Sequence, residues 1–182
     1  MRLFVGIEIP KEIREKIAPE LSLKIPRREF KIVEEKNLHI TLCFIGEVPE
    51  ESAPEIKSRL SEIKFASFRA RLEGAGSFPG RVLWLGLSDG AKECEELAAK
   101  TRHALGVQEE RLHAHVTLAR NRHAEDEEFA RAESPIKKMK FAEEFEVRAF
   151  SLLQSRLLQS GPVYEGLAVF PSSTFLSRDS GS

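Results

Sequence analysis

LHITLCFI (residues 38–45) has the length and composition of a buried β-strand, and Gly46 ends it. Its HITL part (residues 39–42) returns in the second half of the chain as HVTL (residues 115–118). Side chains two apart on a strand point to the same face. Each stretch therefore presents one imidazole and one hydroxyl together and turns its aliphatic side chains into a core.

The first half of the chain alternates strand and helix patterns. Its strand candidates are residues 3–9, 38–45, 65–72 and 81–87. A helix pattern opens at Pro10, and Pro19 inside it predicts a kink or a break. A second helix is expected after residues 52–55, which form a capping-box pattern. The turn between the last two strands is assigned to Gly74, Gly76, Pro79 and Gly80.

The second half repeats this plan. Asp89 is expected to cap a helix that Gly106 ends, and a short acidic helix is expected over about residues 125–132. The strand candidates are residues 113–119, 143–153 and 163–170, with Gly161-Pro162 as the turn before the last. The repeat favours an α+β fold of two similar lobes. We expect one domain over residues 1–171 and a loose tail over residues 172–182.

Composition excludes several classes of protein. Hydrophobic residues make up 41% and charged residues 31%, which fits a globular protein and not a disordered one. No apolar stretch approaches the roughly 20 residues that a membrane-spanning helix needs. Residues 1–10 are too short and too acidic for a signal peptide. Cys43 and Cys94 cannot form a disulfide framework or a four-cysteine zinc site, so we expect a cytoplasmic protein without a membrane partner.

Net charge limits how the protein can bind nucleic acid. The formal net charge is −1, so no overall basic field would drive non-specific binding. If the substrate is RNA, a short basic pocket must therefore bind one end of the strand.

His39 and His115 suit acid–base chemistry on a phosphodiester. A neutral imidazole can take a proton from water, and a protonated one can give a proton to the leaving ribose oxygen. Histidine fits because its pKa of about 6.5 lets both forms exist near neutral pH. Thr41 and Thr117 can donate hydrogen bonds to non-bridging phosphate oxygens, where the transition state holds negative charge. The two motifs are chemically equivalent, so the residues alone do not assign the acid and the base.

On these paired motifs the chain resembles the 2H phosphoesterase superfamily, and within it the RNA 2′,3′-cyclic phosphodiesterases, also described as 2′-5′ RNA ligases. The resemblance covers nearly the whole chain. Its segments are RLFV (residues 2–5), HITL (39–42), GSFP (76–79), RVLW (81–84), HVTLAR (115–120), Ser151 and GPVY (161–164). In such proteins proline often stands just before the second motif, whereas this chain has Ala114, so the local backbone is less constrained.

The resemblance implies a fold, a reaction and roles for the two histidines. It implies a bilobal α+β fold in which antiparallel sheets flank a central cleft. The implied reaction is metal-independent hydrolysis of a terminal 2′,3′-cyclic phosphate to a 2′-phosphate, without a cofactor. It also implies His39 as the proton donor to the 3′ oxygen and His115 as the proton acceptor that activates water. The implied partners are RNA 3′ ends with a cyclic phosphate, tRNA-derived ends being one candidate, and the implied state is a monomer.

Arg120, Tyr164, Phe4 and Phe44 are further candidates for substrate binding. Arg120 follows the second motif and could contact the phosphate or a neighbouring ribose, the alternative being a surface ion pair. The aromatic residues could stack a terminal base. Core packing is the alternative for Phe4 and Phe44, and the place of Tyr164 after a Gly-Pro turn favours the rim of the cleft.

His113 shares a strand face with His115, and a His-x-His pair can bind a metal ion. No third ligand stands at a recognisable spacing, so we favour a neighbour that tunes His115 or a residue at the strand edge. His103 and His123 are expected to be solvated.

Two alternatives to hydrolysis stay open. RNA joining through a 2′-5′ linkage is formally the reverse reaction at the same site, and both directions share one transition state. A module that binds a nucleotide or an RNA end without catalysis is the other alternative. Intact copies of both histidines and both threonines argue against it, because binding alone would not need two proton-transfer groups.

Overall fold

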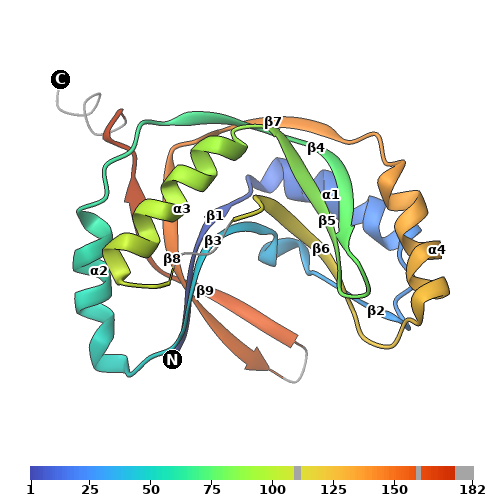
Figure 1. The fold of residues 1–182 in the computed structure, drawn as a ribbon, viewed down its shortest axis with the longest axis horizontal. Helices are drawn as coiled ribbons and strands as arrows, with labels where there is room; N and C mark the ends of the chain where they lie inside the picture. The colour runs from blue at the N-terminus through green and yellow to red at the C-terminus, as the bar shows by residue number, and fades with distance from the viewer. Residues whose placement is uncertain (109–111, 159–160, 175–182) are drawn as a thin grey trace.

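A computed structural model of the chain describes residues 1–108, 112–158 and 161–174 and shows a curled antiparallel sheet with helices on its outer side (Figure 1). The strands are β1 (Arg2–Glu8), β2 (Phe30–Ile32), β3 (His39–Glu47), β4 (Phe68–Phe78), β5 (Val82–Asp89), β6 (His115–Asn121), β7 (Ala142–Val147), β8 (Ala149–Leu158) and β9 (Gly161–Pro171). The helices are α1 (Lys11–Lys24), α2 (Ala53–Ser61), α3 (Ala91–Leu105) and α4 (Asp126–Lys137), with short 3-10 helices η1 (Glu35–Asn37) and η2 (Glu50–Ser52).

The nine strands form one continuous sheet made of two lobes. Their order is β7-β4-β5-β6-β3-β1-β8-β9, and β2 also pairs with β6. The lobes meet where β3 pairs with β6 through one residue pair, Ile40 and Val116. The prediction of an α+β fold with two antiparallel lobes is confirmed. The lobes share a sheet at this junction, because β2 pairs with β6 over residues 119–121 and leaves room for β3 only near Val116.

Helices cover each lobe, as the amphipathic patterns predict. Helix α3 packs on β3 and against α2, while α4 packs on β4 and contacts α1 (Figure 1). The buried residues recur at helical spacing in each helix: Ile13, Ile17 and Leu21; Ile56 and Leu60; Cys94, Leu97, Ala98, Thr101 and Arg102; Phe129, Ala132 and Ile136. Buried side chains from both lobes form one hydrophobic core. None of the helices in the described residues combines the length and apolar character that a membrane crossing requires.

The structure differs from the prediction in one helix and one strand. Helix α1 runs through Pro19 without a break, held by the buried side chains on either side of it, Ile17 and Leu21. The single strand expected over residues 143–153 is two strands, β7 and β8. Strand β7 pairs with β4 and β8 pairs with β1, so the chain passes from one lobe to the other at Arg148.

The turns and caps differ from prediction in three places. Gly74 and Gly76 lie inside β4 and not in the turn, which falls at Pro79-Gly80. A Cβ on Gly76 would lie 2.5 Å from the Trp84 ring, so glycine allows close packing there. The box at residues 52–55 does not form, since Ser52 makes no capping bond and ends η2. Asp89 ends β5, and the N-cap of α3 is Gly90.

Three more boundaries shift. Helix α4 runs to Lys137 and not to about residue 132, and its capping box is made by Glu125 and Glu128. Strand β2 was not expected from the sequence. The start of the tail is held, because the Ser172 and Ser173 amides donate to the carbonyls of Arg148 and Phe65. Residues 175–182 lie outside the described residues, so the boundary at residue 171 stays a prediction.

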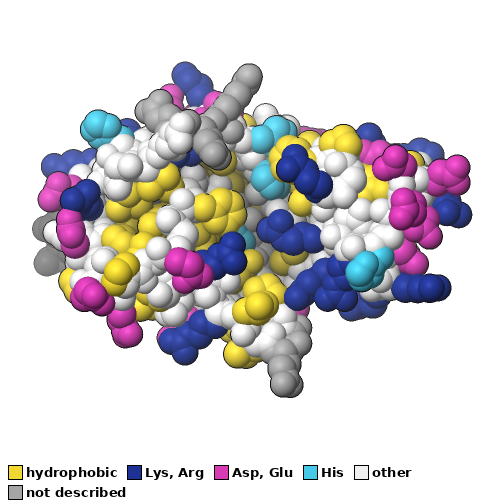
Figure 2. Space-filling model, turned by 60° about the horizontal axis from the view of Figure 1, so that its bottom comes forward, with side chains coloured by type: hydrophobic (Ala, Val, Ile, Leu, Met, Phe, Trp, Pro, Cys, Tyr) yellow, Lys and Arg dark blue, Asp and Glu magenta, His cyan; other side chains and the backbone are white. Residues whose placement is uncertain are grey.

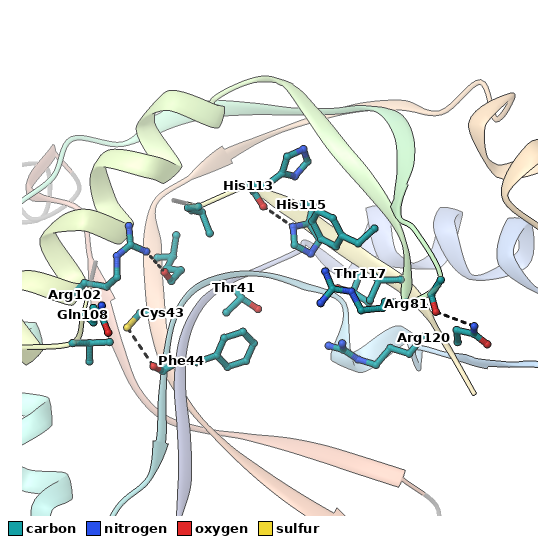
Figure 3. A pocket seen from close by; sticks show the side chains of 17 residues that line it. Thr41, Cys43, Phe44, Arg81, Arg102, Gln108, His113, His115, Thr117 and Arg120 are labelled. Carbon is teal, nitrogen blue, oxygen red and sulfur yellow. Dashed lines mark hydrogen bonds between the residues drawn. The ribbon is translucent and has the colours of Figure 1, made fainter. Parts of the chain in front are cut away.

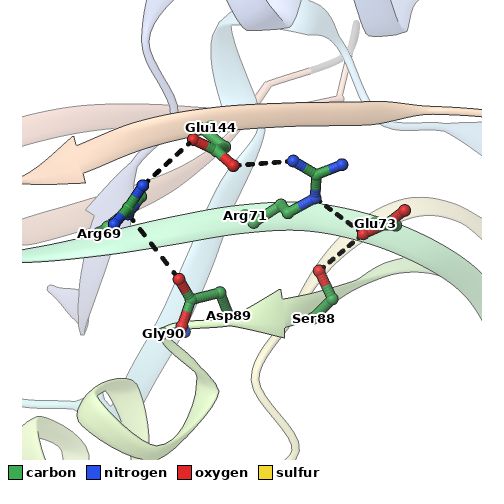
Figure 4. Close-up of polar contacts among 7 residues, drawn as sticks. All are labelled: Arg69, Arg71, Glu73, Ser88, Asp89, Gly90 and Glu144. Atoms are coloured by element: carbon green, nitrogen blue, oxygen red, sulfur yellow. Dashed lines mark hydrogen bonds and ion pairs between the residues drawn. The ribbon is translucent and has the colours of Figure 1, made fainter.

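A network of solvent-accessible polar side chains joins β7, β4 and β5 just before α3 begins (Figure 4). Arg71 donates to Glu73 and Glu144 at 2.8 and 2.7 Å, and Arg69 lies 3.7 Å from Glu144 and 3.9 Å from Asp89. Exposed ion pairs of this kind each contribute about 0–1 kcal/mol. The conformation of the backbone after Asp89 therefore depends more on Gly90 than on these ion pairs. Gly90 takes a left-handed conformation with φ of 82°.

Gly90→Ala is expected to destabilise the protein more than Gly106→Ala, although both glycines have positive φ. A Cβ on Gly90 would lie 2.6 Å from the Arg69 carbonyl oxygen, whereas Gly106 has open space around it. Left-handed strain plus backbone overlap should lower the free energy of unfolding by about 2–4 kcal/mol at Gly90, and strain alone by about 1 kcal/mol at Gly106. Urea unfolding of both variants measures this, and equal losses would contradict the assignment.

Candidate active site

The junction of the two lobes brings the two motifs together. Ile40 and Val116 are fully buried, so their neighbours along each strand face the opposite side of the sheet. These neighbours are His39 and Thr41 on β3 and His115 and Thr117 on β6. All four side chains are half-buried. The junction thus places both imidazoles and both hydroxyls on one face of the sheet.

Backbone carbonyl groups fix both imidazole rings in the same way. The Nδ1 atom of His39 lies 2.7 Å from the Asn37 carbonyl oxygen, and that of His115 lies 2.5 Å from the His113 carbonyl oxygen. A carbonyl oxygen only accepts, so Nδ1 carries the hydrogen in both rings and Nε2 is the atom that exchanges protons. The Nε2 atom of His39 lies 2.9 Å from the Thr41 hydroxyl oxygen.

A cleft of about 940 Å³ opens beside these residues (Figure 3). It is lined by Thr41, Leu42, Cys43, Phe44, Phe78, Gly80, Arg81, Val82, Arg102, Val107, Gln108, Leu112, His113, His115, Thr117, Arg120 and Asn121. His39 stands next to this lining, in contact with Thr41. No carboxylate occurs among the described residues that line the cleft, while three arginines do. Figure 2 shows basic and histidine side chains around the hollow, so a local basic pocket exists in a chain of net charge −1.

Aromatic side chains surround His39. Its ring centre lies 4.9 Å from that of Phe4 and 5.2 Å from that of Tyr164. Phe4 is buried, which agrees with core packing, whereas Phe44 is 65% exposed and lines the cleft. Phe44 lies 6.2 Å from Phe4, so the sequence candidates Phe4, Phe44 and Tyr164 belong to one aromatic group next to the first motif.

A second aromatic group surrounds His115, and sequence reasoning did not identify it as part of the site. Phe78 lies 5.1 Å from the His115 ring, and Trp84 lies 4.6 Å from the His113 ring. Trp84 pairs with Thr117 across β5 and β6. The segments that contain Phe78 and Trp84 were part of the family resemblance, but nothing in their spacing placed them beside the second motif. Arg81 and Arg102 were missed as well.

Arg120 is placed so that its positive charge affects the pKa of both His39 and His115. It lines the cleft and makes no ion pair with another described residue, so the surface ion pair is not formed. Burial is the largest cause that lowers the pKa of His39, and the positive charges of Arg120 and His115 lower it further. Burial also lowers the pKa of His115, and there His113 and Arg120 add to the effect. In the free protein the neutral imidazoles are favoured.

His113 lies beside the second motif without a set of metal ligands around it. Across residues 1–108, 112–158 and 161–174, no three histidine, cysteine, aspartate or glutamate side chains gather in a way that could hold a metal ion. The ring of His113 packs against Trp84 and Phe78, 5.7 Å from the ring of His115. Its position agrees with a neighbour that tunes His115.

The sequence profile of LigT-like phosphoesterases matches the chain twice, over residues 7–84 and 85–164. The chain belongs to the LigT-like phosphoesterase family. The double match confirms the repeat that the two motifs predict. A relative named RNA 2′,3′-cyclic phosphodiesterase from Archaeoglobus fulgidus is 39% identical over 93% of this chain and 99% of its own length. One of the same name from Methanocaldococcus jannaschii is 33% identical over 91% of this chain and 97% of its own length.

Solved structures of LigT-like proteins have the same fold. A crystal structure from Thermus thermophilus superposes with a TM-score of 0.77 at 31% identity and covers 94% of this chain and 97% of its own. E. coli LigT complexed with 3′-AMP superposes with a TM-score of 0.79 at 26% identity, over 94% of this chain and 98% of its own. The curled antiparallel sheet is therefore shared with E. coli LigT.

Arg120→Gln is expected to raise the pKa of both His39 and His115, because it removes a positive charge that lowers both. Titration of the histidine ring protons by NMR measures this in the free protein. Arg122→Gln removes the same charge from an exposed position two residues along and serves as the control. Unchanged titration midpoints of both imidazoles in Arg120→Gln would contradict the electrostatic assignment.

Proposed function

We propose that the protein hydrolyses RNA 3′ ends that carry a 2′,3′-cyclic phosphate and leaves a 2′-phosphate. The observation that carries this proposal is the lobe junction, which gathers two imidazoles and two threonine hydroxyls beside a basic cleft. The names of the relatives support the substrate class, and the complex of E. coli LigT with 3′-AMP supports a nucleotide end in this cleft. A cleft whose described lining holds three arginines and no carboxylate suits an anion.

The reaction needs one proton acceptor and one proton donor. The threonine hydroxyls and the Arg120 guanidinium stabilise charge on the non-bridging oxygens. His115 Nε2 takes a proton from water, and the water oxygen forms a bond to phosphorus. The bond from phosphorus to the 3′ oxygen breaks, and His39 Nε2 gives that oxygen a proton. The 2′ ester remains, so the product ends in a 2′-phosphate and a 3′-hydroxyl.

The surroundings of the two rings support this division of roles. Glu8 pairs with His39 across β1 and β3, and its negative charge acts to raise the pKa of His39. Ser151 donates a hydrogen bond of 2.8 Å to the Glu8 carboxylate. Around His115 the neighbouring charges of His113 and Arg120 both act to lower the pKa. Arg120 acts on both rings, and each ring also has an imidazole neighbour that lowers its pKa, so Glu8 is the charge that distinguishes them and the reason to assign the donor role to His39.

Binding of the substrate favours the protonated form of His39 that the donor role requires. Burial keeps His39 neutral in the free protein, yet a donor must be protonated. The cyclic phosphate carries a negative charge, which favours protonation of a nearby imidazole. Proton uptake by His39 is therefore coupled to binding of the phosphate.

His39→Ala and His115→Ala should each lower kcat for a cyclic-phosphate RNA end by roughly 10²–10⁴-fold, because each removes one proton transfer. His123→Ala is the matched control, since His123 is exposed in the turn after β6. Steady-state kinetics with an oligonucleotide that ends in a cyclic phosphate measures the loss. Undiminished turnover in either of the first two variants would rule out the paired mechanism.

The product should be a 2′-phosphate, formed at the same rate when EDTA is present. A 2′-phosphate is expected because His39 gives its proton to the 3′ oxygen, which leaves the ester at the 2′ oxygen intact. An unchanged rate with EDTA is expected because side chains alone carry out the catalysis. Digestion with an enzyme specific for 3′-phosphates, followed by mass spectrometry, identifies the product. A 3′-phosphate would mean that the bond to the 2′ oxygen breaks. Two further outcomes would favour the alternative functions. Formation of joined RNA under the same conditions would favour the ligase reaction. Tight binding of the RNA end without turnover would favour a binding module.

A further inference from the structure

Arg102 is a buried charge that the reaction above does not use. It lies on α3, is 8% exposed and lines the cleft. Its Nη1 atom donates to the Leu42 carbonyl oxygen at 3.2 Å. Its Nε atom is buried and has no hydrogen-bond partner among the described residues. The described part of the chain also provides no carboxylate that forms an ion pair with it.

Burial of an unpaired guanidinium is unfavourable. A charge moved out of water is normally paired, and a buried charge left without its partner strongly destabilises a protein. One carbonyl contact satisfies a single N–H of the five that arginine offers. Residues 1–108, 112–158 and 161–174 leave the charge of Arg102 unbalanced, which is the arrangement expected where an anion completes the site.

The position of Arg102 identifies the part of a substrate that it would meet. The Leu42 carbonyl that it contacts directly follows Thr41 on β3. In Figure 3, Arg102 lies at one end of the cleft and Arg120 at the other, with Thr41 between them. Gln108, which has an uncharged polar side chain, and the exposed Phe44 also line the cleft. A phosphate held by Thr41 and Arg120 thus leaves Arg102 for a second anionic group.

We propose that Arg102 binds the phosphodiester that joins the terminal nucleotide to the preceding one. This inference rests on the proposed function, because it takes the cyclic phosphate to lie at Thr41 and Thr117. A guanidinium offers paired N–H donors that match two phosphate oxygens, and its charge balances that of the phosphodiester. The cleft then holds two consecutive phosphate groups, so an oligonucleotide end is a better substrate than a cyclic mononucleotide.

Substrates with and without the internal charge test this assignment. The three probes are a nucleoside 2′,3′-cyclic phosphate, a dinucleotide ending in the cyclic phosphate, and that dinucleotide with an uncharged methylphosphonate as its internal linkage. The unsubstituted protein should prefer the charged dinucleotide over the methylphosphonate by about tenfold to a hundredfold in kcat/KM, the range for a charge-assisted hydrogen bond. Arg102→Gln should abolish most of that preference, and Arg102→Lys should keep part of it.

Arg59→Gln is the control for loss of one positive charge. Arg59 is exposed on α2 and forms an ion pair with Glu55. This variant should keep the full preference for the charged dinucleotide. If Arg102→Gln lowers kcat/KM equally for all three probes, the residue only joins α3 to β3 and the inference is wrong. An unsubstituted protein that does not distinguish the two dinucleotides would also overturn it.

A binding experiment separates this inference from the proposed function. Calorimetry with a dinucleotide that ends in a 3′-phosphate, and with its methylphosphonate form, needs no turnover. If no cyclic phosphate is hydrolysed, the proposed function fails. A preference for the charged linkage that Arg102→Gln removes would still support the second phosphate site, and an equal affinity for both forms would refute it.

Discussion

The pairing of Ile40 with Val116 is the constraint on which the rest of the site depends. Both side chains are fully buried, so the hydrophobic core and not a polar contact fixes the register at the lobe junction. A shift of one residue would turn the imidazoles into the core and the aliphatic side chains into the cleft. The same pair places both imidazoles and both hydroxyls on one face of the sheet.

The same junction explains why a charged cleft exists there. Strands β2 and β3 both pair with the same edge of β6. Strand β3 therefore pairs with β6 through a single residue pair, and beyond that pair the two lobes diverge. The divergence exposes the polar ends of strands that are otherwise buried. Arg81, Arg102 and Arg120 gather in this space without carboxylate partners among the described residues. Burial and the positive charge of Arg120 lower the pKa values of both imidazoles, and the negative charge of a bound phosphate would act in the opposite direction.

The parts that sequence predicted are those encoded by local patterns. The alternation around residues 39–42 and 115–118 is enough to assign the face of each imidazole, and the repeat is enough to infer two lobes. Residues that reach the site through long-range pairing carry no such signal. Trp84 lies beside Thr117 only because β5 pairs with β6, and Arg102 stands on an ordinary amphipathic helix. The change of lobe at Arg148 is invisible for the same reason, since the apolar pattern continues across it.

The two motifs are chemically equivalent, but the strands beside them give the two histidines different surroundings. Strand β1 lies beside the first motif and sets Glu8 opposite His39, whereas β5 lies beside the second and sets Gly86 opposite His115. One position therefore supplies a carboxylate that favours an imidazolium, and its counterpart supplies no side chain. The ring of His113 adds a positive neighbour on the second side only. The proposed assignment of His39 as the acid and His115 as the base therefore depends on the residue that stands opposite each of two equivalent motifs.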